Sequence, residues 1–79
     1  MWKITKNYQE ETLYTSSNFK EDVELKHKFK IYDDDGELYC EGLSDDDCSF
    51  DPLDDYGMPS LGATEIHYLN PKTGHYDVL

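Results

Sequence analysis

The chain has 79 residues and a formal net charge of −11 at pH 7. A chain of this length forms one domain, residues 1–79, and buries only about 60% of the surface that its unfolded form exposes. So small a core leaves little room for a deep catalytic cleft, and we expect no enzyme activity. Aromatic residues make up 14% of the chain, which is too many for a disordered acidic tail.

The negative charge is unevenly distributed along the chain. Residues 1–30 hold six lysines against five acids, whereas residues 31–71 hold twelve acids and no lysine or arginine. Such a field repels nucleic acid and anionic membranes and attracts cations or a basic protein surface. We therefore expect no direct nucleic-acid binding and no membrane binding.

No apolar stretch approaches the roughly 20 residues of a membrane span, and no targeting signal is visible. The sequence thus favours a cytoplasmic protein. In that compartment Cys40 and Cys48 are expected to be free thiols rather than a disulfide.

The first thirty residues favour strands, while Asn7 followed by Glu10 also fits the start of a helix. Trp2 and Ile4 alternate with polar residues, which indicates a short strand, and residues 12–15 favour a second strand that would form a hairpin with it. The clearest pattern covers residues 22–32, where apolar side chains alternate with charged ones for ten residues. The apolar face holds Val23, Leu25, His27, Phe29 and Ile31.

Residues 33–36 predict a tight turn after this strand. A four-residue loop would pair Ile31 with Leu38 and Phe29 with Cys40, and would place Gly36 where a positive φ is needed. A second hairpin is expected over residues 63–79, with Pro71 and Gly74 in its turn. Between the two hairpins, residues 44–62 predict a long ordered loop with one helical turn near residues 52–55. Phe50, Leu53, Tyr56 and Leu61 would attach it to the sheet.

The predicted fold class is all-β or β-rich α+β, with a single small antiparallel sheet of hairpins and a long acidic loop. The candidate site for a partner is the acidic surface, with tyrosines interspersed because tyrosine often anchors interfaces. The candidate residues are Asp33, Asp34, Asp35, Glu37, Tyr39, Glu41, Asp45, Asp46, Asp47, Asp51, Asp54, Asp55 and Tyr56.

Metal binding and catalysis have weaker support. An EF-hand register with Gly36 at its sixth position puts Ile31 first and Gly42 twelfth, so both ends lack a ligand oxygen. The cysteines and histidines do not have zinc-knuckle spacing, and the acids near Cys48 would raise the pKa of its thiol. We expect no cofactor and no catalytic residue.

Three functions remain open. The first is a non-catalytic module that binds a basic protein surface, in its sharper form a nucleic-acid mimic. The second is a calcium-type metal-binding protein that uses the loop of residues 45–55. The third is a small housekeeping subunit whose acids serve only solubility. A tiny acidic chain with two hairpins and no catalytic set is similar in general character to phage-encoded inhibitors of host defence, several of which mimic DNA. This similarity assigns a role to no residue.

Overall fold

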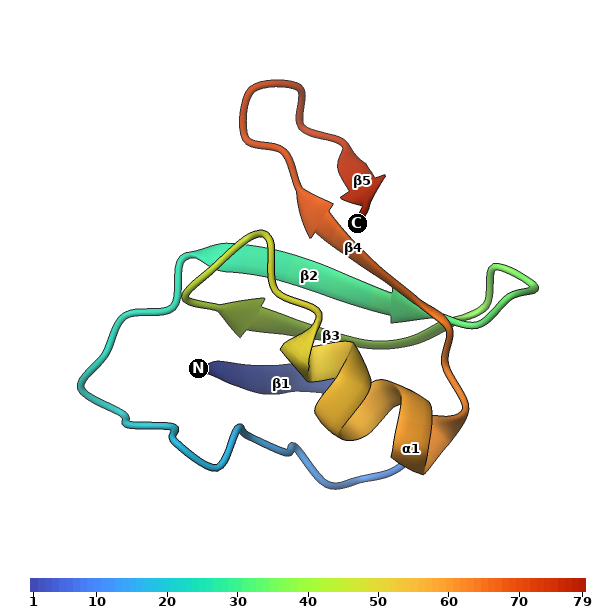
Figure 1. Cartoon of the computed structure of the whole chain (residues 1–79), viewed down its shortest axis with the longest axis horizontal. Coiled ribbons are helices and arrows are strands. Elements are labelled where there is room, and N and C mark those ends of the chain that lie inside the picture. The colour runs from blue at the N-terminus through green and yellow to red at the C-terminus, as the bar shows by residue number, and fades with distance from the viewer.

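A computed structural model describes residues 1–79 as one antiparallel sheet of five strands with a short helical segment on one face (Figure 1). The strands are β1 (Trp2–Asn7), β2 (His27–Tyr32), β3 (Leu38–Ser44), β4 (Glu65–Leu69) and β5 (Tyr76–Val78). Their order across the sheet is β1-β3-β2-β4-β5, so β2 and β3 lie at its centre. The predicted β-rich fold with a single antiparallel sheet is confirmed.

The core lies between the sheet and the helical segment. Ile31 on β2 is paired with Cys40 on β3 and with Ile66 on β4, and all three side chains are fully buried or nearly so. Phe29 and Tyr68 form the next row, with their rings 5.9 Å apart in an edge-on arrangement. Because side chains of paired residues share a face, these rows explain why the other face of the sheet carries the polar residues of the same strands.

The helical segment is longer than the predicted single turn. Residues 51–61 are helical, with a π-helical part η1 (Leu53–Gly57) followed by α1 (Met58–Leu61). Leu53 and Tyr56 are buried against the sheet, as predicted. Phe50 is 46% exposed, so the prediction that it also attaches this segment is wrong. The side chain of Phe50 precedes the helix and lies outside its buried stripe.

The strand predicted over residues 22–32 forms only from His27 onward. Its neighbours limit it, because β3 ends at Ser44, opposite His27, and β4 begins its pairing at Phe29. Residues 22–26 therefore have no partner for their backbone groups in the sheet, and Val23 is 38% exposed. Alternation of apolar residues predicted the burial of Leu25, Phe29 and Ile31 correctly, but it could not show where pairing stops.

The register predicted for the β2–β3 hairpin is also wrong. Tyr32 pairs with Leu38, and an irregularity between Ile31 and Tyr32 then sets Ile31 opposite Cys40. This bulge shifts the register by one residue. The apolar side chains of the two strands therefore return to a common face, which the Tyr32–Leu38 pairing without a bulge would not allow. Gly36 adopts φ +82°, as the turn requires. In the second hairpin, β4 pairs with β5 as predicted, and Gly74 adopts φ +76°.

The predicted N-terminal hairpin is reduced to one bridge. Lys3 pairs with Thr15, supported by backbone hydrogen bonds from Ile4 to Tyr14 and from Ser16 to Trp2. Residues 12–15 do not form a strand. Asn7 Oδ1 accepts hydrogen bonds from the amides of Gln9 and Glu10, a local turn that ends β1. Residues 8–26 then follow an irregular path around the β1 edge of the sheet (Figure 1).

The helices of the molecule are too short and too polar to span a bilayer. Cys40 is buried in the core, Cys48 is exposed, and neither forms a disulfide.

Candidate functional site: an ordered acidic loop

Six exposed aspartates lie on the segment that runs from the end of β3 into the helix. This segment, residues 45–55, is called the acidic loop below, and its aspartates are Asp45, Asp46, Asp47, Asp51, Asp54 and Asp55. All six carboxylates are solvent-accessible, and the sequence predicted all six as site residues. About half of the predicted acidic residues thus lie on one exposed segment.

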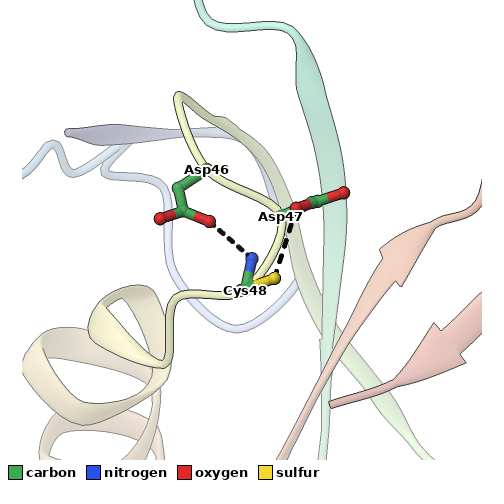
Figure 2. A group of neighbouring side chains, drawn as sticks. All are labelled: Asp46, Asp47 and Cys48. Carbon is green, nitrogen blue, oxygen red and sulfur yellow. Dashed lines mark hydrogen bonds between the residues drawn. The ribbon is translucent and has the colours of Figure 1, made fainter.

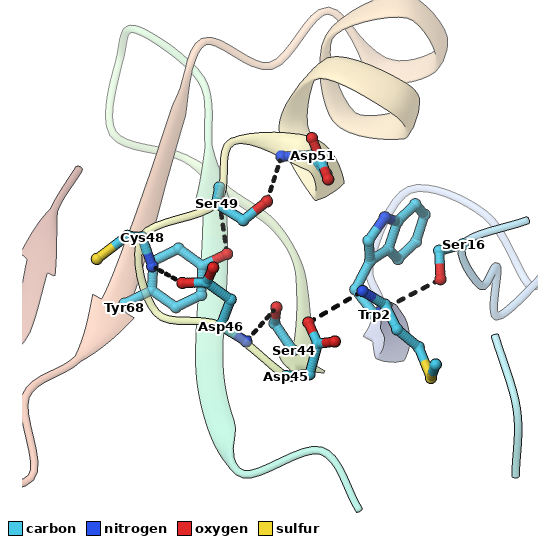
Figure 3. Close-up of polar contacts among 10 residues, drawn as sticks. Trp2, Ser16, Ser44, Asp45, Asp46, Cys48, Ser49, Asp51 and Tyr68 are labelled. Atoms are coloured by element: carbon cyan, nitrogen blue, oxygen red, sulfur yellow. Dashed lines mark hydrogen bonds and ion pairs between the residues drawn. The ribbon is translucent and has the colours of Figure 1, made fainter. Parts of the chain in front are cut away.

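Local hydrogen bonds give the acidic loop a defined conformation (Figure 3). Ser44 Oγ accepts a hydrogen bond from the amide of Asp46 at 3.2 Å. Asp46 Oδ1 accepts one from the amide of Cys48 at 2.7 Å, and Ser49 Oγ accepts one from the amide of Asp51 at 3.1 Å. Short polar side chains that bond backbone amides two residues ahead favour turns over helix or strand. The run of Ser and Asp is therefore the local cause of the loop as well as the source of its charge.

One residue that the sequence analysis missed holds the middle of the acidic loop to the sheet. Tyr68, on β4, is buried, and its hydroxyl donates a 2.6 Å hydrogen bond to the carbonyl oxygen of Ser49 (Figure 3). Burial, together with the negative charges of Asp46, Asp51 and Asp47, raises the pKa of Tyr68 to about 12. These three carboxylates therefore act together on one buried hydroxyl. The apolar alternation of residues 63–69 signalled that Tyr68 is core, but not which loop it binds.

The N-terminal end of the acidic loop has a further attachment. The α-amino group of Met1 lies 2.9 Å from Asp45 Oδ1, and the amide of Asp45 donates to the carbonyl of Met1. The loop is thus held at its start by β1 and at its middle by β4.

Asp46, Asp47 and Cys48 form the tightest group of possible metal ligands in the loop (Figure 2). One ligand atom from each lies within 4.8 Å of the others, and all three side chains are exposed. Asp46 Oδ1 is already bonded to the amide of Cys48, and the Cys48 thiol lies 3.4 Å from Asp47 Oδ1. That hydrogen bond raises the pKa of Cys48, with added repulsion from Asp47 and Asp46, so the thiolate needed for metal binding is disfavoured.

The acids of the β2–β3 turn form a second, separate group. Asp34, Asp35 and Glu37 are exposed, whereas Asp33 is buried and accepts hydrogen bonds from the amides of Asp35 and Glu37 at 2.9 and 2.8 Å. The Glu37 amide bond is the main cause that lowers the pKa of Asp33. Asp33 therefore shapes the turn. This group lies at one end of β3 and the acidic loop begins at the other end (Figure 1), which at about 3.3 Å per residue separates the turn from the start of the loop by roughly 20 Å. The loop then leads back to the helical segment on the face of the sheet.

The remaining predicted residues lie outside both groups. Glu41 belongs to the sheet face that the helix does not cover, where its Oε2 accepts a 2.6 Å hydrogen bond from the hydroxyl of Tyr8. Tyr39 is half-buried beside Asp33, whose carboxylate raises the pKa of that tyrosine. Tyr56 is buried, and its hydroxyl donates to Glu10 Oε1 at 2.7 Å and accepts from Asn7 Nδ2 at 2.8 Å.

The uncovered sheet face carries the opposite charge. Lys3 and Lys28 flank Leu43, and Lys6 and Lys30 flank Glu41, so four lysines gather on the face away from the core. Glu41 and Glu65 are the acids of the strands on this face. Lys30 Nζ also lies 4.3 Å from the ring centre of Tyr76. The molecule therefore separates a cationic sheet face from the acidic loop and the acidic turn.

Comparison of the chain with protein-family models, with curated proteins and with solved structures gives no match.

Proposed function

We propose that this protein is a non-catalytic binding module whose acidic loop docks on a basic surface of a partner protein. The observation that carries the proposal is the order of the loop: six exposed aspartates are attached through Ser44, Ser49 and Tyr68 to the sheet. Charges that are already fixed lose little conformational entropy on binding, so more of their attraction appears as affinity.

The sharper form of the proposal is that the carboxylates imitate the phosphates of a nucleic acid and occupy a groove that binds one. Lysine and arginine side chains make strong charge-assisted hydrogen bonds to phosphate and carboxylate alike. The distance between the acidic loop and the acidic turn sets a requirement on the partner. A basic groove must extend roughly 20 Å, about the length of β3, to contact both the acidic turn and the start of the acidic loop.

Capture from a cell lysate tests the proposal. The tagged protein is incubated at about 50 mM and about 500 mM NaCl, and the retained proteins are quantified by mass spectrometry. We expect basic nucleic-acid-binding proteins to be retained at low salt only, and added DNA to compete with them. Retention that is unchanged by salt and DNA would contradict the proposal.

Two matched variants separate the acidic loop from overall charge. The variant Asp47→Asn, Asp51→Asn, Asp54→Asn removes three loop charges, and the control Glu21→Gln, Asp22→Asn, Glu24→Gln removes three charges that belong to neither acidic group. Both sets of side chains are exposed. Binding through the acidic loop predicts that the first variant loses at least tenfold more partner than the control. Equal losses would point to the general field of the protein alone.

Binding of a divalent cation is the alternative use of the same carboxylates. The proximity of Asp46, Asp47 and Cys48 favours it, while the hydrogen bonds that occupy Asp46 and the thiol oppose it. Calorimetry with Ca²⁺ decides between the two: saturable heat that disappears in Asp47→Asn would support a metal site, and its absence would favour the protein partner.

A further inference from the structure

A hollow of about 430 Å³ separates residues 14–17 from the helical segment. Its lining consists of Trp2, Tyr14, Thr15, Ser16, Ser17, Asp55, Tyr56 and Ser60. The molecule has four hollows, and each of the other three is lined by at least one lysine. This hollow is the only one of the four whose lining includes a carboxylate but no lysine. It also has more aromatic rings in its lining than any of the other three.

The aromatic wall is a stack of three rings. Tyr14 packs on Tyr56 with ring centres 4.5 Å apart, and Tyr56 stacks on Trp2 with ring centres 6.4 Å apart. Trp2 and Tyr56 are buried, whereas Tyr14 is 39% exposed and offers its ring to a ligand. The stack is rigid because the hydroxyl of Tyr56 is held by both Glu10 and Asn7.

The polar wall offers acceptors. Asp55 is exposed on the helical segment, and its carboxylate forms no salt bridge, although Asp54 beside it adds to the negative potential. Ser17 and Ser60 are exposed, and their hydroxyls are able to accept hydrogen bonds from a ligand. Ser16 Oγ is already used, since it accepts from the amide of Trp2 at 3.0 Å.

We infer that this hollow receives an arginine side chain of the basic partner, an inference that rests on the function proposed above. A guanidinium is planar, permanently charged and rich in donors, so it stacks on Tyr14 while it donates to Asp55 and to the serine hydroxyls. An anionic ligand would be repelled by Asp55. An apolar ligand would bury that carboxylate without a partner, which costs free energy. The hollow thus adds a specific pocket beside the acidic loop.

The single tryptophan of the chain makes occupancy measurable, because Trp2 belongs to the lining. The probe is N-acetyl-arginine amide, titrated while Trp2 fluorescence is recorded. N-acetyl-citrulline amide, which has the same shape without the charge, and N-acetyl-lysine amide are the controls. We expect a saturable fluorescence change with the arginine probe, a weaker one with lysine and none with citrulline. Equal responses to arginine and citrulline, or no saturable response, would overturn the inference.

Two neighbouring helix residues provide matched variants. Asp55→Asn is expected to weaken arginine binding about tenfold. Asp54→Asn changes the net charge equally but is not part of the lining, so it should weaken arginine binding far less than Asp55→Asn does. Circular dichroism checks that both variants are folded. An equal loss in both would show that only long-range charge matters.

The outcome is separable from that of the proposed function. Capture of a basic partner without a fluorescence response to the arginine probe would contradict only the inference that the hollow binds arginine. A response to the arginine probe without any salt-sensitive partner would support the arginine site and contradict the docking role of the acidic loop.

Discussion

Tyr68 is the residue on which the order of the acidic loop depends most. It links β4, in the folded core, to Ser49, which has no neighbour in the sheet. A buried hydroxyl that donates to a loop carbonyl stabilises the folded state modestly, but its loss leaves that carbonyl without a partner. This one hydrogen bond therefore contributes both to the stability of the fold and to the order of the loop that the proposed function uses.

Tyr68→Phe is expected to lower the free energy of unfolding by about 1–2 kcal/mol. Hydrogen exchange should speed up at the amides of residues 45–51 in particular. Urea denaturation and exchange measured by NMR check this, with Tyr32→Phe as the control because the hydroxyl of Tyr32 makes no hydrogen bond within the protein. Equal effects of the two variants would contradict the assigned role of Tyr68.

Tyr68 also predicts a pH dependence at the alkaline end. Its pKa is raised to about 12 in the folded protein, against about 10 for an unfolded tyrosine. The unfolded state therefore loses this proton first, so the stabilisation is complete below pH 10 and declines as the pH rises toward 12. Urea denaturation at several pH values should show a smaller decline in Tyr68→Phe than in the wild type.

Asp33 predicts the opposite dependence at the acid end. Its two amide hydrogen bonds lower its pKa, so its stabilisation is present above the ordinary pKa of aspartate, about 3.9, and declines as the pH falls below it. Asp33→Ala should destabilise the protein at pH 7, and the difference from the wild type should shrink at pH 3. Asp34→Ala, which removes an exposed carboxylate from the same turn, should show neither effect.

At the scale of elements, the packing of β1, β3 and β2 depends on one small residue. Gly42, on β3, lies opposite both Ile4 and Phe29. A Cβ atom placed there would lie 2.3 Å from the carbonyl oxygen of Lys3 and 2.5 Å from Cζ of Phe29. The absence of a side chain at Gly42 is therefore what lets the ring of Phe29 fill the core between the central strands.

Gly42→Ala is expected to cost about 1–3 kcal/mol or more of stability, because the strand or the ring must move. Gly36→Asn serves as the comparison, since Gly36 has open space around it and asparagine tolerates the positive φ of that turn. Thermal denaturation should show a large loss for the first variant and little for the second. A stable Gly42→Ala protein would contradict the close packing described here.

At the scale of the whole molecule, charge is separated by the sheet. Four lysines lie on the uncovered face, while the acidic loop and the acidic turn carry most of the aspartates. A net charge of −11 on 79 residues destabilises the folded state through repulsion among the acids. We propose that the acidic residues are retained despite this repulsion because they bind the proposed partner.

Moderate salt should therefore stabilise the protein. We expect the melting temperature to rise between about 10 mM and about 300 mM NaCl, because the Debye length falls from about 30 Å to less than 8 Å. The variant Asp47→Asn, Asp51→Asn, Asp54→Asn should start with a higher melting temperature at low salt and gain less from added salt. A melting temperature independent of salt in the wild type would show that the carboxylates do not repel one another appreciably.

The amino-acid sequence by itself determined which residues are apolar and alternate, where the glycine turns fall and where the acids are concentrated. These properties are local, so they predicted the β-rich fold, the buried Phe29, Ile31 and Cys40, and the composition of the acidic loop. They also predicted a positive φ at Gly36 and placed Gly74 in the second turn, and both glycines adopt positive φ.

Only the tertiary structure decided the register of the central hairpin, the extent of β2, the length of the helical segment and the partner of Tyr68. Each of these depends on contacts between residues far apart in the chain, whose free energies compete with local preference. For the same reason, the sequence showed how many carboxylates there are, whereas the fold decided that the acidic turn and the start of the acidic loop lie at opposite ends of β3 and that Asp55 and Tyr14 line one hollow.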